Sequence, residues 1–305
     1  MIKRMLIAIL LGYLVSSAAQ ASSVSYEVVK SGRIAAHVVT VSLADPETRV
    51  TVALARGGVG KGESFKSIVK RSRPVAAITG TFYDTKTMIP TGDIAVFGTV
   101  VHTGCVGSAL CIDSQNKAVV VPLRKGRAEG WGAYETVLGC GPSLVTNGAI
   151  SVALSKEGFG SSLTAPATRT AVGITRAGKL LLVAVNRKTS LHAVARLMKS
   201  LGAVDALSLD GGSSTGFYAN GRFIASPSRQ MTNLLVVYKS FSDYAYARDQ
   251  LVPPALLDKQ AARTASARPA EVKAEPGVVI RAASASPAAI SPRDIPMLLP
   301  DVSNR

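Results

Sequence analysis

Residues 169–186 read RTAVGITRAGKLLLVAVN, and this stretch decides the fold class. Two apolar runs flank the turn pair Ala177-Gly178, so the stretch predicts a β-hairpin. The next segment, TSLHAVARLMKSLGA (189–203), carries apolar residues at helical spacing and predicts an amphipathic helix. A short strand, DALSLD (205–210), follows it. Hairpins interrupted by single helices predict an α+β fold with a mixed β-sheet.

The flanking sequence extends the same pattern into one domain with a few packed helices. Asn147-Gly148 and Asn220-Gly221 are strong hairpin signals. GESFKSIVKRS (62–72) has apolar residues at helical spacing and ends before a proline, which predicts a second helix. Further strands are predicted at 35–43, 49–55, 75–80 and 233–238.

The two ends differ from this body in composition. Residues 1–21 combine Lys3 and Arg4, an apolar run and a small-residue AQA site, which predicts a secretory signal peptide. We therefore expect an exported protein, periplasmic or secreted, with an uncleaved anchor as the alternative. Residues 241–305 hold eight of the fifteen prolines and many alanines. We expect a disordered Ala/Pro-rich tail there, acting as a linker or as a tether to the cell envelope.

The charge of the body indicates the class of partner. Residues 22–240 hold 25 Lys and Arg against 12 Asp and Glu. Such an excess favours a phosphate-bearing substrate, an anionic glycan or a membrane surface, with a basic solvated surface as the alternative. No nucleic acid is expected, because aromatic and basic residues are not interleaved as stacking platforms require. The sequence also lacks a G-x-G-x-x-G or phosphate-loop lysine motif, which disfavours nucleotide-binding folds.

The three cysteines fit an oxidising compartment. Cys105 and Cys111 bracket the short loop CVGSALC, and we expect them to form a disulfide. Cys140 is then left as a buried free thiol. The three have no spacing typical of a zinc site, so the metal content stays unassigned.

Three carboxylates stand beside glycine at predicted strand ends: Asp84 in TGTFYD, Asp93 in PTGD and Asp210 in LSLDGGSSTG (207–216). Glycine lets the backbone approach a ligand closely and adopt positive φ. Each segment alone is weak evidence for a site, because Asp-Gly is also common turn chemistry.

Seven segments in order, ITGTFYD, PTGDI, GPSLVTNG, TRTAVGIT, KLLLVAVN, LGAVDALSLDGGSS and GRFIASPSRQMTNLLVVY, resemble the phosphodiester glycosidase family over residues 75–238. The resemblance implies that residues 22–240 form a hydrolase domain for sugar-1-phosphodiesters, such as those of N-acetylglucosamine. It also implies exported bacterial relatives associated with exopolysaccharide. Two departures stand out: Thr79-Gly80 replaces the usual Asn-Gly, and Ser213 stands where a third glycine is common.

The resemblance implies roles for particular residues. Asp210 would stabilise the oxocarbenium-like sugar carbon, or act as nucleophile or base, with a plain turn as the alternative. Arg169 would bind the phosphate, with Arg229 as second candidate, or Arg169 would instead pin the sheet. Asp93 or Asp84 would orient a water or the sugar hydroxyls. Substrate contacts are expected from Thr79, Gly80, Asp84, Thr170, Asn186, Gly211, Gly212, Ser213, Arg229 and Asn233.

Two other functions stay open. In the first, Asp84, Asp93 and Asp210 bind a divalent cation in a phosphodiesterase that cuts the P–O bond. In the second, the protein is a non-catalytic envelope protein that binds an anionic glycan. The glycosidase interpretation itself requires no cofactor.

Overall fold

The computed structural model describes residues 22–104, 106–123, 130–253 and 255–256. Its strands form three sheets. The largest has seven strands, in the order β1 (Val24–Ser31), β2 (Ile34–Val41), β13 (Leu180–Thr189), β12 (Ala167–Thr175), β14 (Ala203–Leu209), β10 (Ser143–Thr146) and β11 (Ala149–Ile150).

The other two sheets have five strands each. One, called the β4 sheet below, runs β16 (Arg222–Ala225), β15 (Phe217–Ala219), β4 (Ala76–Thr79), β17 (Asn233–Tyr238) and β3 (Arg49–Leu54). The other, called the β9 sheet, runs β6 (Thr99–His102), β5 (Ile94–Val96), β9 (Tyr134–Cys140), β7 (Ser108–Asp113) and β8 (Ala118–Pro122). The predicted α+β class is confirmed. The predicted mixed sheet is wrong, because the pairings between these named strands are all antiparallel.

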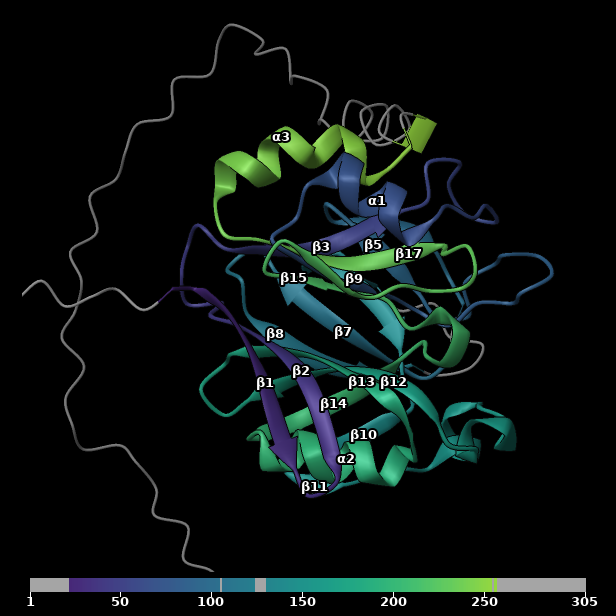
Figure 1. Ribbon diagram of the computed structural model, residues 1–305. Helices are drawn as coiled ribbons and strands as arrows, with labels where there is room; N and C mark the ends of the chain where they lie inside the picture. The colour runs from purple at the N-terminus through teal and green to yellow at the C-terminus, as the bar shows by residue number, and fades with distance from the viewer. Residues whose placement is uncertain (1–21, 105, 124–129, 254, 257–305) are drawn as a thin grey trace, which may run out of the picture. The chain divides into compact units, whose positions relative to one another are not determined.

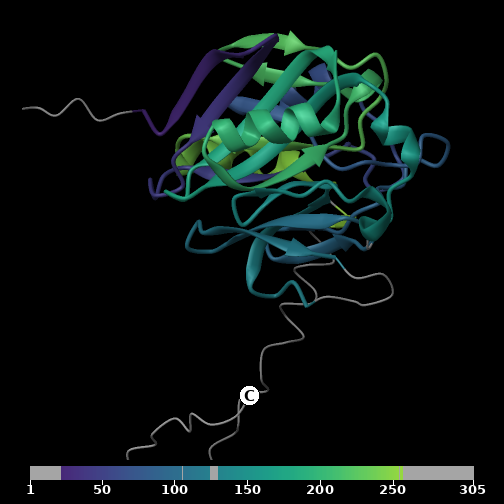
Figure 2. The same ribbon diagram turned by 90° about the horizontal axis from the view of Figure 1, so that it is seen from below.

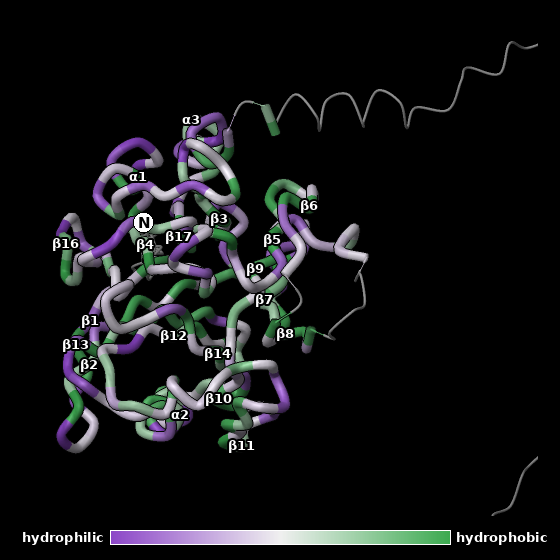
Figure 3. The backbone as a smooth tube through the Cα atoms, turned by 90° about the vertical axis from the view of Figure 1, so that its right-hand side faces the viewer, coloured by the Kyte–Doolittle hydropathy of each residue, from purple (hydrophilic) through white to green (hydrophobic). Residues whose placement is uncertain are grey.

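Helices cover the outer faces of the sheets. Helix α2 (Leu191–Ser200) packs on β10, β12 and β14, while α1 (Phe65–Ser72) and α3 (Phe241–Leu251) pack on β3. Figure 1 shows α1 and α3 at one end and α2 at the other, and Figure 2 shows α2 lying across the seven-stranded sheet. The main core joins apolar residues of all three sheets, and a second core lies between the seven-stranded sheet and α2. In Figure 3 the hydrophobic segments concentrate on the inner strands, and hydrophilic ones surround α1.

Local signals in the sequence explain where these elements begin and end. Ser190 caps α2, because its Oγ accepts a hydrogen bond from the Ala193 N–H (3.3 Å), and Gly202 with φ +87° ends that segment. Asn147-Gly148 and Asn220-Gly221 both have positive φ and turn the β10–β11 and β15–β16 hairpins. These predicted turns and the predicted α2 helix are confirmed.

The prediction of a disordered tail from Phe241 is wrong for its first residues, which form α3. Ser240 caps this helix through the Asp243 N–H (3.1 Å), and Tyr244, Ala247 and Leu251 turn one face inward. Their i, i+3, i+7 spacing is helical, but the alanines and charges around them conceal it. The domain therefore includes α3. The predicted signal peptide (1–21) and the rest of the predicted tail (257–305) lie outside the described residues.

Among the described residues, no helix is both long and apolar enough to cross a membrane.

Candidate active site

Asp210 lies directly after β14, where the seven-stranded sheet meets the β4 sheet. Its N–H donates to the Gly80 carbonyl (3.2 Å), and its carbonyl accepts a bond from the Thr170 hydroxyl (2.5 Å). Its Oδ1 accepts from the Gly211 N–H (2.9 Å). Asp210 is thus held by β4 on one side and β12 on the other, and Gly80 and Thr170 position it.

Burial raises the pKa of the Asp210 carboxyl to about 6, although Ser214, the Gly211 N–H and Arg229 each act to lower it. The residue itself is only partly exposed. A partly buried carboxyl with a pKa near neutrality is a common feature of functional sites, although structural networks also produce it.

The two glycines shape the loop around this carboxyl. Gly212 has φ +60° and opens a 3-10 turn, η3 (Gly212–Ser214). A Cβ on Gly211 would lie 2.7 Å from the Thr168 carbonyl, so β12 requires a glycine there. The Thr168 hydroxyl donates to the Gly212 carbonyl (3.0 Å). The segment after Asp210 therefore forms a turn, and the shape of this turn holds the Asp210 carboxyl in place.

Thr79 connects the β4 sheet to the same loop. Its hydroxyl donates to the Ser214 carbonyl (2.6 Å) and accepts from the Gly216 N–H (2.7 Å). The hydroxyl at this position thus makes two buried bonds to the loop, so Thr79 acts as a positioning residue.

Asn233 supports the loop from β17. Its Oδ1 accepts from the Thr81 N–H (3.1 Å), and its Nδ2 donates to the Thr232 hydroxyl (2.9 Å). A Cβ on Gly80 would lie 1.8 Å from the Asn233 Oδ1, so the two residues are matched in shape. Asn233 is buried, and its position supports a positioning role in place of a direct substrate contact.

Tyr83 is a functional candidate that the sequence reasoning missed. Its ring is buried, and its hydroxyl donates to the Gln230 carbonyl (2.6 Å). Burial is the main cause that raises its pKa, and the negative charge of Asp210 raises it further. It stands in the segment TGTFYD, in which only the carboxylate of Asp84 indicated a function from the sequence.

Arg229 faces Asp210 from the loop that precedes β17. The Ser228 N–H donates to the Ser213 carbonyl (3.0 Å), which fixes this loop against η3. The Arg229 side chain is exposed, and its charge lowers the pKa of both Asp210 and Tyr83. Together with Ser214, which affects the same two groups, these residues form what we call the Asp210 cluster: Asp210, Tyr83, Ser214 and Arg229.

Two buried hydroxyls in or beside the cluster lack a hydrogen bond: that of Ser214, within the cluster, and that of Thr81, two residues before Tyr83. Ser214 Oγ and Thr81 Oγ1 belong to residues that are each 1% exposed, and neither has a partner of adequate geometry among the described residues. Ser214 Oγ is close enough to the Asp210 and Tyr83 side chains to lower both pKa values. Unpaired buried hydroxyls are uncommon and indicate capacity for a further polar partner.

Arg169 does not join the cluster through its guanidinium. Its Nε donates to the Thr189 carbonyl (3.1 Å), and its Nη2 donates to the carbonyls of Leu163 (2.9 Å) and Ala165. The residue is 4% exposed, and burial lowers its pKa. It ties η2 (Ser161–Thr164) to the end of β13. This placement supports the alternative in which Arg169 pins the sheet, and it favours Arg229 as the candidate phosphate ligand.

Asp93 is also engaged elsewhere. It is 1% exposed, its Oδ1 accepts from the Gly104 N–H (2.7 Å), and its Oδ2 accepts from the Trp131 Nε1–H (2.9 Å). Both oxygens therefore stabilise the β9 sheet. This arrangement supports a structural role for Asp93, and its catalytic role stays a prediction.

Asp84 and Asn186 are exposed polar residues of turns and strand ends. Asp84 Oδ1 accepts from the N–H groups of Lys86 (2.9 Å) and Thr87 (2.8 Å) and from the Thr87 hydroxyl (3.0 Å), which closes its own turn. Asn186 donates only a long bond, to the Ile224 carbonyl (3.4 Å). Neither arrangement supports the predicted substrate contact.

The predicted Cys105–Cys111 disulfide stays a prediction, because Cys105 lies outside the described residues. Cys111 is buried in β7. Cys140 is free and buried, as predicted. Burial raises the pKa of each of these two thiols to about 12, so both are protonated and unreactive at neutral pH.

The residues that the structure describes contain no group of three or more His, Cys, Asp or Glu side chains that could hold a metal ion. Asp84, Asp93 and Asp210 have separate partners, so they do not form the single ligand set of the phosphodiesterase alternative.

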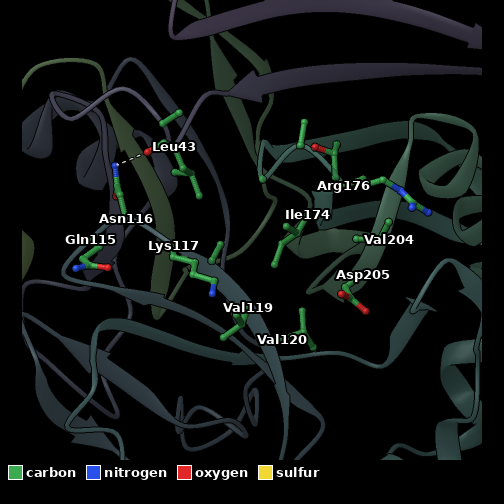
Figure 4. Close-up of a pocket in the computed structure, with 15 residues that line it drawn as sticks. Leu43, Gln115, Asn116, Lys117, Val119, Val120, Ile174, Arg176, Val204 and Asp205 are labelled. Atoms are coloured by element: carbon green, nitrogen blue, oxygen red, sulfur yellow. Dashed lines mark hydrogen bonds between the residues drawn. The ribbon is translucent and has the colours of Figure 1, made fainter. Parts of the chain in front are cut away.

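A cavity of about 690 Å³ lies away from the cluster, between the β7–β8 and β12–β13 turns (Figure 4). Val204 and Asp205 line it at the start of β14. Asp210 follows the other end of that strand, about 17 Å away at a strand's rise per residue. The cavity is therefore separate from the candidate active site.

Two solved structures have a fold similar to that of this protein. The catalytic domain of zebrafish N-acetylglucosamine-1-phosphodiester alpha-N-acetylglucosaminidase, auto-inhibited by its pro-peptide, has a similar fold, with a TM-score of 0.59 at 20% identity, over 70% of this chain and 82% of that chain. A hypothetical protein from Synechocystis gives a TM-score of 0.55 at 17% identity, over 70% of this chain and 61% of that one. No curated protein sequence matches significantly.

The family comparison is more specific than these fold matches. The phosphodiester glycosidase family matches residues 72–238, which is more than half of the chain and includes all four residues of the Asp210 cluster. The chain therefore belongs to the phosphodiester glycosidase family.

Proposed function

We propose that this protein is an exported hydrolase that cleaves the sugar–oxygen bond of a sugar-1-phosphodiester. The observation that carries the proposal is the Asp210 cluster, in which a carboxyl with a pKa of about 6 and the Tyr83 hydroxyl both lie within the electrostatic influence of Ser214 and the exposed Arg229. Family membership supports the reaction class.

Arg229 would bind the phosphate. A guanidinium keeps its charge and pairs with two phosphate oxygens at once. The leaving group is a phosphate monoester and only weakly basic, so a cation serves it better than a proton donor. The Tyr83 hydroxyl beside Arg229 donates to the Gln230 carbonyl, and its oxygen remains able to accept a bond.

Asp210 would act on the sugar carbon. At neutral pH a carboxyl with a pKa of about 6 is mostly ionised, and its negative charge stabilises an oxocarbenium-like centre or attacks it. In the described part of the chain, the groups that shift this pKa are Ser214, Gly211 and Arg229. None is a carboxyl, so the cluster differs from the usual carboxylate pair of glycosidases.

The buried hydroxyls of Ser214 and Thr81 would bind a sugar hydroxyl or the attacking water. Neither has a hydrogen-bond partner among the residues that the structure describes, and a ligand that supplies one removes the cost of an unpaired buried group.

N-acetylglucosamine-1-phosphodiesters are the first substrates to test, because the zebrafish enzyme of similar fold is named for them. The basic body and the signal-like residues 1–21 support action outside the cytoplasm, on phosphate-bearing glycan of the cell envelope or exopolysaccharide.

The deciding experiment is hydrolysis of a sugar-1-phosphodiester panel in ¹⁸O-labelled water. We expect free sugar that carries the label at its anomeric carbon, with activity lost in Asp210→Asn. Label in the phosphate product would instead establish P–O cleavage. No turnover of any panel member by folded protein would overturn the proposal in favour of a binding protein.

A further inference from the structure

Three basic side chains lie on separate loops next to the Asp210 cluster. Lys61 precedes α1, Lys86 lies in the turn between β4 and β5, and Arg229 precedes β17; all three are exposed. These loops meet: a Cβ on Gly62 would lie 2.7 Å from the Gln230 Cβ and 2.7 Å from the Met88 Cε. Each of the three basic residues is therefore one or two positions along the chain from the point where the three loops touch.

Lys66 continues the surface along α1. Its Nζ lies over the Phe223 ring, 5.6 Å from the centroid, and Phe223 packs edge-on against Phe65. The Phe65 ring in turn contacts the segment around Gly216, which follows η3. Lys66 thus lies on the side of α1 that faces the loop of the cluster.

The carboxylates in these segments offset little of this charge. Glu63 is occupied by the Arg71 guanidinium (2.8 Å) and also accepts bonds from the Arg56 N–H and the Ser67 hydroxyl. Asp84 is the remaining carboxylate; it stays ionised in its turn and offsets one of the four cations. Lys61, Lys66, Lys86 and Arg229, which we call the basic strip, therefore keep a net positive charge.

We propose that the basic strip binds additional phosphates of a polymeric substrate, a chain of sugars joined by phosphodiesters. This inference rests on the proposed function and specifies its substrate class. A single diester needs one cation at the scissile phosphate, and Arg229 supplies it. Three further exposed cations beside that position complement a chain with a charge at every linkage.

The test compares substrates of different length. Purified protein is given one sugar-1-phosphodiester and a series of sugar-phosphate oligomers of the same sugar, with kcat/KM measured at low and high NaCl. We expect kcat/KM to rise about tenfold from one diester to four at low salt, and the gain to shrink at high salt, since exposed charges are screened.

The variants locate the effect. Lys61→Ala with Lys86→Ala removes most of the length dependence and leaves the single-diester rate unchanged. The matched control, Lys179→Ala with Lys199→Ala, removes two exposed lysines from the β12–β13 turn and α2, and we expect it to retain the gain.

The outcomes separate the two proposals. A hydrolysed single diester with no gain from length, or equal losses in both double variants, overturns the strip proposal alone. Binding of anionic lipid vesicles through the same lysines, without a length effect, also overturns it. If no diester is hydrolysed, the proposed function fails, and the strip is judged by salt-dependent binding of the oligomers, which Lys61→Ala with Lys86→Ala must weaken.

Discussion

The hydroxyl of Thr79 donates a hydrogen bond of 2.6 Å to the carbonyl of Ser214, which lies 135 residues further along the chain. The same oxygen accepts from the Gly216 N–H (2.7 Å). One buried side chain of the β4 sheet thereby fixes the loop that carries Asp210.

Thr79→Val tests this connection. It keeps the shape of the side chain but leaves a buried carbonyl and a buried N–H unpaired, which costs about 1–3 kcal/mol of unfolding free energy. We expect a lower Tm and a lower kcat with little change in KM, because the loop loses its register. Thr79→Ser retains the hydroxyl and should behave like the natural protein. Equal effects of the two variants would contradict the role of the bond.

Asp210→Asn should stabilise the protein while it abolishes activity. The folded pKa of Asp210 is raised to about 6 from an ordinary value of 3.8, so the protonated form favours the folded state. That stability is fully present below pH 3.8 and is lost as the pH rises through 6. The ionised carboxyl then costs on the order of 1–3 kcal/mol, which the amide avoids. Unfolding midpoints should show the gain at pH 8 and little of it near pH 4. An unchanged difference across that range would refute the pKa argument.

The charge of Arg229 should shift the acid limb of the pH–rate profile, which the ionisation of Asp210 sets. Activity requires ionised Asp210, so kcat/KM should fall as the pH drops below about 6. The Arg229 charge lowers this pKa, so Arg229→Ala should move the limb to higher pH. Arg229→Lys retains the charge and should leave the limb in place. We also expect Arg229→Ala to reduce kcat/KM by about 10²-fold through lost phosphate contact. A limb that moves equally in both variants would contradict this assignment.

Arg169→Lys should act on stability. A single ammonium cannot reproduce the fork that joins the carbonyls of Thr189, Leu163 and Ala165, so we expect a loss of about 1–3 kcal/mol in chemical denaturation. Remaining folded enzyme should keep its KM for the diester. A stable variant with a raised KM would restore Arg169 as the phosphate ligand.

Local signals in the sequence were sufficient for most of the fold. Asn147-Gly148 and Asn220-Gly221 adopt the positive φ that their hairpins need, and Ser190 caps its helix. Helix α3 was missed because its inward face holds only three residues, among alanines and charges.

The site was less predictable than the fold. Asp210 was identifiable because glycine beside a carboxylate at a strand end is a local pattern. The destinations of Arg169 and Asp93 were not, since each depends on distant carbonyls and N–H groups that the sequence does not order in space. Tyr83 was missed because an aromatic residue in a turn is ordinarily interpreted as packing.

Strands position Asp210 and surface loops carry the basic residues, which has a consequence for how this protein can evolve. Asp210 is fixed by β4 and β12, whereas Lys61, Lys86 and Arg229 stand on surface loops, which tolerate substitution and insertion. Under the proposed function, drift in those loops can alter which substrate is accepted while the Asp210 carboxyl stays in place. Relatives with this scaffold would then differ in substrate specificity before they differ in the reaction they catalyse.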